Sequence, residues 1–333
     1  MWYYKICILF YCFGGFLLKV PAQTPGECWN IIDAEGSFTP REENTCIAVE
    51  DDIFFIGGRG NLPVDVYNIT TNTWKALKQT PWQLHHFQAV EYKDEIYAIC
   101  AQYGPYPHEK PYSNIFIYNP LKDSWREGDS IPADRRRGSA GCVVYQDKIY
   151  VVCGIIDGHW DGHVRWFDEY NPATGEWKKL PDAPHARDHF EAVVYDDKLY
   201  CIGGRKSTGV TKQVFNLTVP FVDVFDFQTG RWSTLDTQIP TQRAGASTVV
   251  VGDEIVLIGG ESVQPEAHNE CEAYNPETNT WRSFPKLSVP RHGTTAVKVD
   301  GVIYIGAGAS RKGGSPKVES IECLRGYKGF TSE

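Results

Sequence analysis

The chain has 333 residues, of which 33 are lysine or arginine and 42 are aspartate or glutamate, so its formal net charge is −9. This acidic balance argues against nucleic acid, or an anionic membrane surface, as the main partner. A chain of this length would ordinarily form two domains, but a repeat architecture can hold it in one closed unit.

The first 22 residues have the pattern of a secretory signal peptide. Lys5 precedes an apolar run from Ile6 to Leu18, and Val20-Pro21-Ala22 offers small residues for cleavage. The run has 13 residues, too few to span a bilayer; an uncleaved membrane anchor is the alternative. We expect a signal peptide at 1–22 and a single secreted, extracellular domain at 23–333 with no membrane span. Loss of the two lysines of the signal would leave 31 basic and 42 acidic residues, a net charge of −11.

Tryptophan recurs along the chain at intervals of 45 to 55 residues. The same parts follow in the same order each time: a short strand, a polar turn, a second strand that ends in small residues, and a third strand that leads to the next tryptophan. Polar turns between β-branched or aromatic runs are typical of antiparallel strand pairs. The six tryptophans are Trp29, Trp74, Trp125, Trp177, Trp232 and Trp281.

Glycine pairs mark the end of the second strand in each repeat. The full pairs are Gly57-Gly58, Gly203-Gly204 and Gly259-Gly260, and the eroded ones are Cys100-Ala101, Cys153-Gly154 and Gly306-Ala307. Paired glycines followed by an aromatic residue, and then by tryptophan six or seven residues later, resemble the kelch repeat. The resemblance covers nearly all of the mature chain. It implies an all-β fold: a six-bladed β-propeller of four-stranded antiparallel blades.

The two ends of the chain are expected to meet in one blade. The last repeat has no tryptophan after Leu324, whereas Trp29 has no glycine pair before it. We therefore expect residues 27–32 to form the outermost strand of the sixth blade, which removes an exposed sheet edge. This arrangement predicts a disulfide between Cys28 and Cys323.

The other cysteines allow more than one reading. An even number of cysteines in a secreted chain permits disulfides. Cys142 and Cys153 lie about equally far from a predicted hairpin turn and could face each other across it. The alternative is that these are separate buried thiols.

Arginines recur just before the first strand of each repeat, except that the second repeat has Leu84 followed by His85 and His86. Placed at the mouth of the central channel, such a ring would suit carboxylates, sulfates or acidic peptide motifs. The alternative is that each arginine caps backbone carbonyls of the neighbouring blade. The predicted ligand-binding residues are Arg41, Arg59, Arg137, Arg187, Arg205, Arg243, Arg291 and His85.

Three long loops are expected on the same face as the channel mouth. The loop from Asp157 to His163 alternates aspartate and histidine and could bind a metal ion; a solvated loop is the simpler reading, so we expect no metal and no cofactor. The loops 103–112 and 206–217 add aromatic and polar groups. Two Asn-x-Thr sequons predict glycosylation at Asn68 and Asn216.

Together these features predict a secreted, non-enzymatic binding or scaffold protein that recognises an extracellular protein or glycan through its loop face, and the arginines favour an acidic one. The alternative is a sugar-acid mutarotase or another carbohydrate-active enzyme. The chain is similar in architecture to bacterial sialic acid mutarotases, which implies an arginine, a glutamate and a histidine around a sugar acid, and Glu261 is a conceivable acid–base group. The central domain of galactose oxidase is also similar in architecture, but its copper ligands have no recognisable counterpart here.

Overall fold

The computed structural model describes residues 28–206 and 208–327. The predicted signal peptide and its cleavage site lie outside the described residues. In the described part of the chain, no helix is both long enough and apolar enough to cross a membrane.

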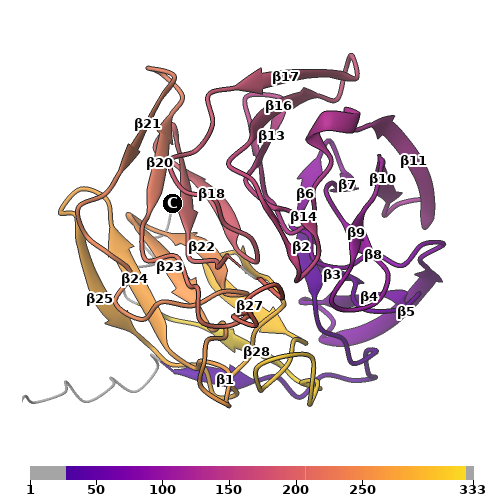
Figure 1. Ribbon diagram of the computed structural model, residues 1–333. Helices are drawn as coiled ribbons and strands as arrows, with labels where there is room; N and C mark the ends of the chain where they lie inside the picture. Colours follow the sequence, from indigo (N-terminus) through magenta and orange to yellow (C-terminus); the bar gives the residue numbers. More distant parts are fainter. Residues whose placement is uncertain (1–27, 207, 328–333) are drawn as a thin grey trace, which may run out of the picture.

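Six four-stranded antiparallel sheets stand around a central axis, which confirms the expected six-bladed propeller (Figure 1). The first strand of each blade lies against the first strands of the two neighbouring blades, so six strands form an inner ring. Blade 1 consists of β2 (Asn44–Val49), β3 (Asp52–Gly57), β4 (Pro63–Asn68) and β5 (Thr73–Gln79). Blade 2 consists of β6 (Ala89–Tyr92), β7 (Glu95–Ala98), β10 (Asn114–Asn119) and β11 (Ser124–Ser130). Blade 3 consists of β12 (Gly141–Tyr145), β13 (Lys148–Val152), β16 (Phe167–Asn171) and β17 (Glu176–Leu180). Blade 4 consists of β18 (Glu191–Tyr195), β19 (Lys198–Ile202), β20 (Asp223–Asp226) and β21 (Arg231–Thr234). Blade 5 consists of β22 (Ser247–Val251), β23 (Glu254–Ile258), β24 (Cys271–Asn275) and β25 (Thr280–Phe284). Blade 6 consists of β26 (Ala296–Val299), β27 (Val302–Gly306), β28 (Ile321–Leu324) and the N-terminal strand β1 (Trp29–Ile31).

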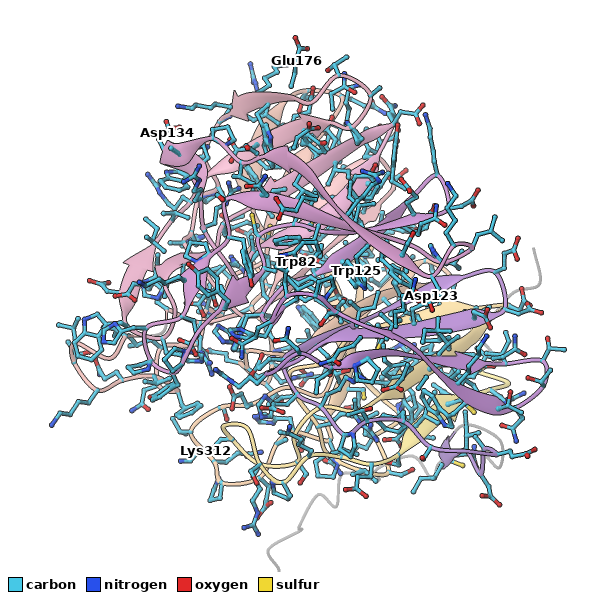
Figure 2. The ribbon with its side chains drawn as sticks, turned by 90° about the vertical axis from the view of Figure 1, so that its right-hand side faces the viewer. Trp82, Asp123, Trp125, Asp134, Glu176 and Lys312 are labelled. Atoms are coloured by element: carbon cyan, nitrogen blue, oxygen red, sulfur yellow. The ribbon has the colours of Figure 1, made fainter. Side chains whose placement is uncertain are left out.

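The recurring tryptophan belongs to the outermost strand and packs on an aromatic residue of the third strand. In blade 3, Trp177 lies opposite Tyr170 in the register of β16 and β17, with their ring centroids 4.8 Å apart. Such cross-strand aromatic pairs stabilise a sheet beyond the area that they bury. Trp82 adds a further ring beside Trp125, edge to face, as Figure 2 shows.

The glycine pair is required by a close approach between blades. Gly259 has φ +63°, and a Cβ on it would lie 2.5 Å from the carbonyl oxygen of Arg291 in the next blade. In blade 6 the pair was assigned to Gly306-Ala307 from the sequence, but the structure puts it one residue later. Ala307 and Gly308 have φ +58° and +83°, and a Cβ on Gly308 would lie 2.6 Å from the carbonyl oxygen of His292.

The ring closes as expected, through the N-terminal strand β1, which is drawn in indigo beside the yellow β28 in Figure 1. Trp29 is buried, and its indole Nε1 donates a hydrogen bond to the carbonyl oxygen of Pro285 at 2.8 Å. The Ser288 hydroxyl donates to the carbonyl oxygen of Trp29 at 2.9 Å. The N-terminal strand is therefore bound through both its backbone and its side chain.

The disulfide predicted between Cys28 and Cys323 is not formed in the structure, and of the two alternatives for Cys142 and Cys153 the structure has separate buried thiols. Cys28 and Cys323 are free thiols, Cys28 exposed and Cys323 buried, because the register puts Asn30 rather than Cys28 opposite Cys323. Cys142 lies opposite Val151. It packs in the core between blades 2 and 3, whereas Cys153 packs in the core between blades 3 and 4.

The long loops carry two small hairpins of their own. β8 (Gln102–Tyr103) pairs with β9 (Lys110–Pro111), and β14 (Ile155–Asp157) pairs with β15 (Asp161–His163). The strands β9 and β14 contact each other. Figure 2 shows Lys312, in the loop after β27, on the opposite side of the molecule from Asp123, in the turn between β10 and β11. The single helical element is one turn of 3-10 helix, Ala133–Arg135, within the described residues.

Candidate functional site

The arginines that recur before each first strand are structural. Arg187 is fully buried; its Nη1 donates to the carbonyl oxygens of Cys201 and Gly203, and its Nη2 donates to Asp223 Oδ2 at 2.6 Å. All of these partners belong to its own blade, so the guanidinium group joins the second and third strands rather than capping the neighbouring blade. The same arrangement is found in the pairs Arg41–Asp65, Arg137–Asp168, Arg243–Glu272 and Arg291–Glu322.

These five arginines therefore do not ring the channel mouth, which corrects the ligand-binding role predicted for them. The acidic partner of each arginine was not expected from the sequence. It lies on the third strand of the blade, two residues before the aromatic or apolar residue that faces the tryptophan of the outermost strand. Blade 2 lacks both members of the pair. Its equivalents, Leu84 and Phe116, pack in one apolar cluster, so the arginine and its acid are lost together.

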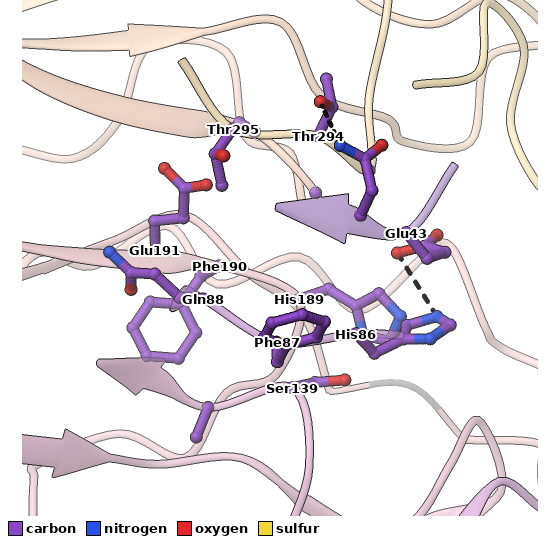
Figure 3. A pocket seen from close by; sticks show the side chains of 15 residues that line it. Glu43, His86, Phe87, Gln88, Ser139, His189, Phe190, Glu191, Thr294 and Thr295 are labelled. Atoms are coloured by element: carbon purple, nitrogen blue, oxygen red, sulfur yellow. Dashed lines mark hydrogen bonds and ion pairs between the residues drawn. The ribbon is translucent and has the colours of Figure 1, made fainter. Parts of the chain in front are cut away.

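A second set of equivalent positions, two residues after the arginines, encircles the channel. Each of these residues has a positive φ, between 49° and 65°, and backbone hydrogen bonds join neighbours around the ring, such as His86 N to Glu43 O and Ser139 N to His86 O. The six residues are Glu43, His86, Ser139, His189, Gly245 and Gly293. They line a cavity of about 420 Å³, counting the open space at its mouth, on the propeller axis, shown in Figure 3.

A larger pocket of about 560 Å³, counting its open mouth, lies among the loops. Glu43 belongs to both cavities, so the pocket leads into the channel. All three of the long loops expected from the sequence contribute, and so does the loop after β27. The pocket is lined by Glu43, Arg59, Tyr106, His159, Arg205, Phe215, Glu261, Gly313 and Gly314.

Arg59 and Arg205 are the two predicted binding arginines that reach this pocket. Arg59 Nη2 lies 2.5 Å from Glu109 Oε1, and Arg205 Nη1 pairs with Glu261. Arg205 also lies over the ring of Phe215, at 5.1 Å from its centroid. Each guanidinium group is thus already neutralised by a carboxylate, which weakens the expectation of a ligand with strong negative charge.

Glu261 is buried rather than solvated. Burial opposes its ionisation, but His292, Arg205 and the backbone N–H of Gly313 outweigh this effect and hold its pKa at about 2. The Gly313 N–H donates to Glu261 Oε2 at 2.8 Å. A carboxylate held in this state is a fixed hydrogen-bond acceptor and a poor general acid at neutral pH.

Three buried histidines meet where the pocket joins the channel. One ring nitrogen from each of His86, His159 and His189 lies within 4.8 Å of the others. The ring centroids are 4.7 to 5.2 Å apart, and the rings meet at steep angles. Burial lowers the pKa of His86 and of His159 below the ordinary value, so both imidazoles are neutral at pH 7.

His85, the remaining predicted binding residue, lies behind this cluster. It is fully buried, its Nδ1 lies 2.6 Å from Nδ1 of His86, and burial lowers its pKa to about 4. It therefore supports His86 and does not line either cavity.

His159 comes from the loop for which a solvated conformation was the simpler expectation, and it is in fact buried. The rest of that loop does not gather around it. Asp157 pairs with His108 at 3.1 Å, and His163 Nε2 lies 3.1 Å from Asp188. The histidine cluster could not be recognised from local sequence because its members are 30 to 103 positions apart in the chain. The signal that could have found it is the recurrence of His86 and His189 at equivalent positions of two repeats.

The two sequons differ in their distance along the chain from the pocket lining, because Asn216 directly follows Phe215. Asn68 ends β4 and donates to Asp52 Oδ1 at 2.7 Å, whereas Asn216 is exposed in the loop before β20. Glycosylation at either site stays a prediction.

Comparison with known proteins gives the family. Residues 129–308 match the family model of the KLHDC2/KLHL20/DRC7 Kelch-repeats domain. The chain is similar to kelch-like protein terF of Aspergillus terreus, with 32% identity over 87% of this chain and 66% of the relative, and to alpha-scruin of Limulus polyphemus, with 26% identity over 71% of this chain and 26% of the relative. It thus spans less than two thirds of the length of these relatives.

Among solved structures, that of YjhT superimposes with a TM-score of 0.72 over 86% of this chain and 95% of the other, at 15% identity. A likeness at this identity concerns the fold alone. The six-bladed architecture, the repeat pattern and the family match together show that the chain belongs to the kelch-repeat family.

Proposed function

We propose that the protein is a secreted binding protein that holds a small hydroxyl-rich ligand, such as a sugar unit of a glycan, in the pocket at the channel mouth. The observation that carries this proposal is the lining of the pocket, where ion-paired side chains lie beside aromatic rings. The pocket is a concave site lined from several loops, which suits a small molecule, whereas a macromolecular partner would use a flatter surface.

The ion pairs favour hydroxyl groups over strong anions. Arg59 is partly exposed and pairs with Glu109 through Nη2, so its other N–H groups can donate to a ligand oxygen, and Glu261 in the same lining is an acceptor. A sugar presents both donors and acceptors and can bridge such a pair. Tyr106, which is 57% exposed at the rim, offers a flat apolar face with a polar end, a combination suited to a sugar ring.

The binding proposal is tested by glycan-array screening followed by saturation-transfer NMR with the sugars that bind. Tyr106→Ala removes the rim aromatic and should weaken binding by about tenfold, equivalent to about 1.4 kcal/mol. Leu121→Ala is the matched control, because Leu121 is 94% exposed in the turn after β10 and should leave binding unchanged. Equal binding by both variants, or capture of a protein partner that is indifferent to Tyr106→Ala, would contradict the proposal.

Secretion rests on the N-terminal sequence alone. Expression of the full chain in a eukaryotic secretory host should release a protein whose first residue is Gln23. Treatment with an N-glycosidase should then increase its gel mobility if Asn68 or Asn216 carries a glycan. Retention of residues 1–22 on a membrane-bound product would favour the anchor instead.

Sugar-acid mutarotation is the second candidate, because Arg205, Glu261 and His159 line the same pocket. The low pKa of Glu261 makes it a base rather than an acid in such a reaction. Proton NMR of a freshly dissolved sialic acid anomer should show faster equilibration with wild-type protein than with Glu261→Gln. An unchanged rate with wild-type protein removes this candidate.

A further inference from the structure

The three histidines at the base of the pocket come from three parts of the fold. His86 and His189 occupy ring positions in blades 2 and 4, and His159 reaches them from the β14–β15 hairpin of blade 3. All three are at least nine-tenths buried. Three imidazoles that converge from separate segments are an arrangement that hydrophobic packing alone does not produce.

Each imidazole is held at its Nδ1 atom. His159 Nδ1 lies 3.1 Å from both carboxylate oxygens of Glu109, and His189 Nδ1 lies 2.6 Å from Asp188 Oδ1. His86 Nδ1 faces Nδ1 of His85. Metal-binding histidines usually have a carboxylate or a similar hydrogen-bond partner on the ring nitrogen that does not bind the metal. This partner fixes the tautomer and orients the other ring nitrogen.

The nitrogen atoms opposite these contacts are available. Nε2 of His86 and Nε2 of His189 are buried and make no hydrogen bond with any described residue. Leaving such an atom buried without a partner costs about 1–3 kcal/mol. Glu43 Oε2 lies 3.4 Å from His86 Nε2, an ion-pair contact marked by a dashed line in Figure 3, which puts a carboxylate next to the cluster.

The charge of the surroundings favours a cation. Four carboxylates, of Glu43, Glu109, Asp188 and Glu261, lie around the histidines and the pocket, whereas two guanidinium groups, of Arg59 and Arg205, balance them. His163 lies beside Asp188 and His292 beside Glu261. Carboxylates nevertheless outnumber guanidinium groups around the cluster, a setting that suits a divalent ion.

We propose that His86, His159 and His189 bind a divalent transition-metal ion such as Zn²⁺, with the remaining coordination position open to the pocket. The ring nitrogens, now within 4.8 Å of one another, need small side-chain rotations to reach the spacing of about 3.3 Å that a tetrahedral site with bonds of about 2.0 Å requires. Three histidines with one open position form the kind of site at which a metal holds water or a ligand oxygen. The metal goes beyond the proposed sugar binding and is tested without any sugar.

The test uses untagged, chelator-stripped full-length protein, because a histidine tag would itself bind the metal. Calorimetric titration with Zn²⁺ should show about one ion per chain, and Co²⁺ should give the strong visible absorption of a tetrahedral site. Absence of both signals in the wild-type protein overturns the proposal, whatever the sugar-binding result. Metal binding without sugar binding would leave this inference standing and remove the proposed function.

Variants assign the ligands. His189→Asn and His86→Gln should each weaken Zn²⁺ binding by more than about 100-fold, beyond the effect expected from an outer-shell partner. His268→Gln is the matched control, because His268 is equally buried but lies outside the cluster, against Ser262 and Glu270. Retained affinity in the first two variants, or equal loss in the control, would contradict the assignment; circular dichroism establishes that each variant is folded.

Glu109→Gln tests the positioning role of the carboxylate behind His159. It should weaken Zn²⁺ binding by about 10- to 100-fold while the Co²⁺ absorption keeps its shape, because the three nitrogen ligands remain. Glu266→Gln, an exposed carboxylate paired with Arg311, should change neither quantity. A Glu109→Gln variant with wild-type affinity would show that the Glu109 contact does not orient the ligand.

Discussion

The buried arginine of each blade is predicted to stabilise the fold without taking part in ligand binding, and blade 6 offers a direct test. Arg291 is fully buried, its Nη2 lies 2.6 Å from Glu322 Oε1, and its Nη1 donates to the carbonyl oxygens of Ala307 and Ser320. The substitution Arg291→Leu removes these bonds and leaves the Glu322 carboxylate buried without its counter-charge.

The expected loss is large. Breaking a buried ion pair from one side costs about 3–5 kcal/mol. For roughly 300 residues the entropy of unfolding is about 0.6 kcal/mol/K, so the melting temperature should fall by about 5–8 °C. Thermal and urea denaturation followed by circular dichroism measure this directly, and Arg231→Gln on an exposed outer-strand residue serves as the control.

Blade 2 shows how the loss can be recovered. The double variant Arg291→Leu/Glu322→Phe copies its Leu84 and Phe116, which pack together without charge. Replacement of a complete buried pair by apolar residues is often neutral, so the double variant should regain most of the stability, and its pocket should bind ligand as the wild-type protein does. A single variant within about 1 kcal/mol of wild type, or a double variant that is folded but no longer binds ligand, would refute the structural assignment.

Three further predictions concern stability. Burial raises the pKa of Glu191 to about 8, far above its value of about 4.3 in the unfolded chain. Between these two values the folded state binds a proton that the unfolded state does not, so the stability of the wild-type protein should fall as the pH rises from about 5 to about 8. Glu191→Gln should flatten this slope in urea titrations at several pH values. Trp29→Ala should cost about 3–5 kcal/mol in chemical denaturation and should increase aggregation, because β28 would lose its covering strand. Gly259→Ala, at φ +63° and with its Cβ 2.5 Å from the Arg291 carbonyl oxygen, should lower stability by about 1–3 kcal/mol, whereas Gly230→Ala, with open space around its Cβ, should cost less by the same measurement.

The fold could be predicted from the sequence because each blade repeats the same solution to the same packing problem. The tryptophan, the aromatic residue opposite it and the glycine pair are local signals, and six copies reinforce one another. The one register error, at Ala307-Gly308, arose because glycine occurs at both Gly306 and Gly308 and only the backbone angles distinguish them. The disulfide expected between Cys28 and Cys323 is not formed because a shift of two residues along β1 separates the two thiols.

The candidate site could be predicted only in part, and for a different reason. The sequence places the column of arginines near the channel but does not say which way a long side chain points. The direction of the arginine side chain is set by the acidic residue two positions before the aromatic residue of the third strand, because the two form an ion pair inside the blade, as Arg187 and Asp223 do. The histidine cluster depends on how far the β14–β15 hairpin folds over the channel, which is set by contacts between loops of different blades.

The ring positions themselves argue that the channel mouth serves a ligand. At this position the chain has a positive φ in every blade, a conformation in which glycine is favoured and a side chain is strained. Gly245 and Gly293 show that the fold is satisfied by glycine there. His86 and His189 occupy the same strained position, bury Nε2 atoms that make no hydrogen bond with a described residue and join no apolar core cluster, so the architecture does not account for them. A buried ligand for those nitrogens does, and their placement beneath the pocket puts that ligand where a sugar and a metal ion would meet.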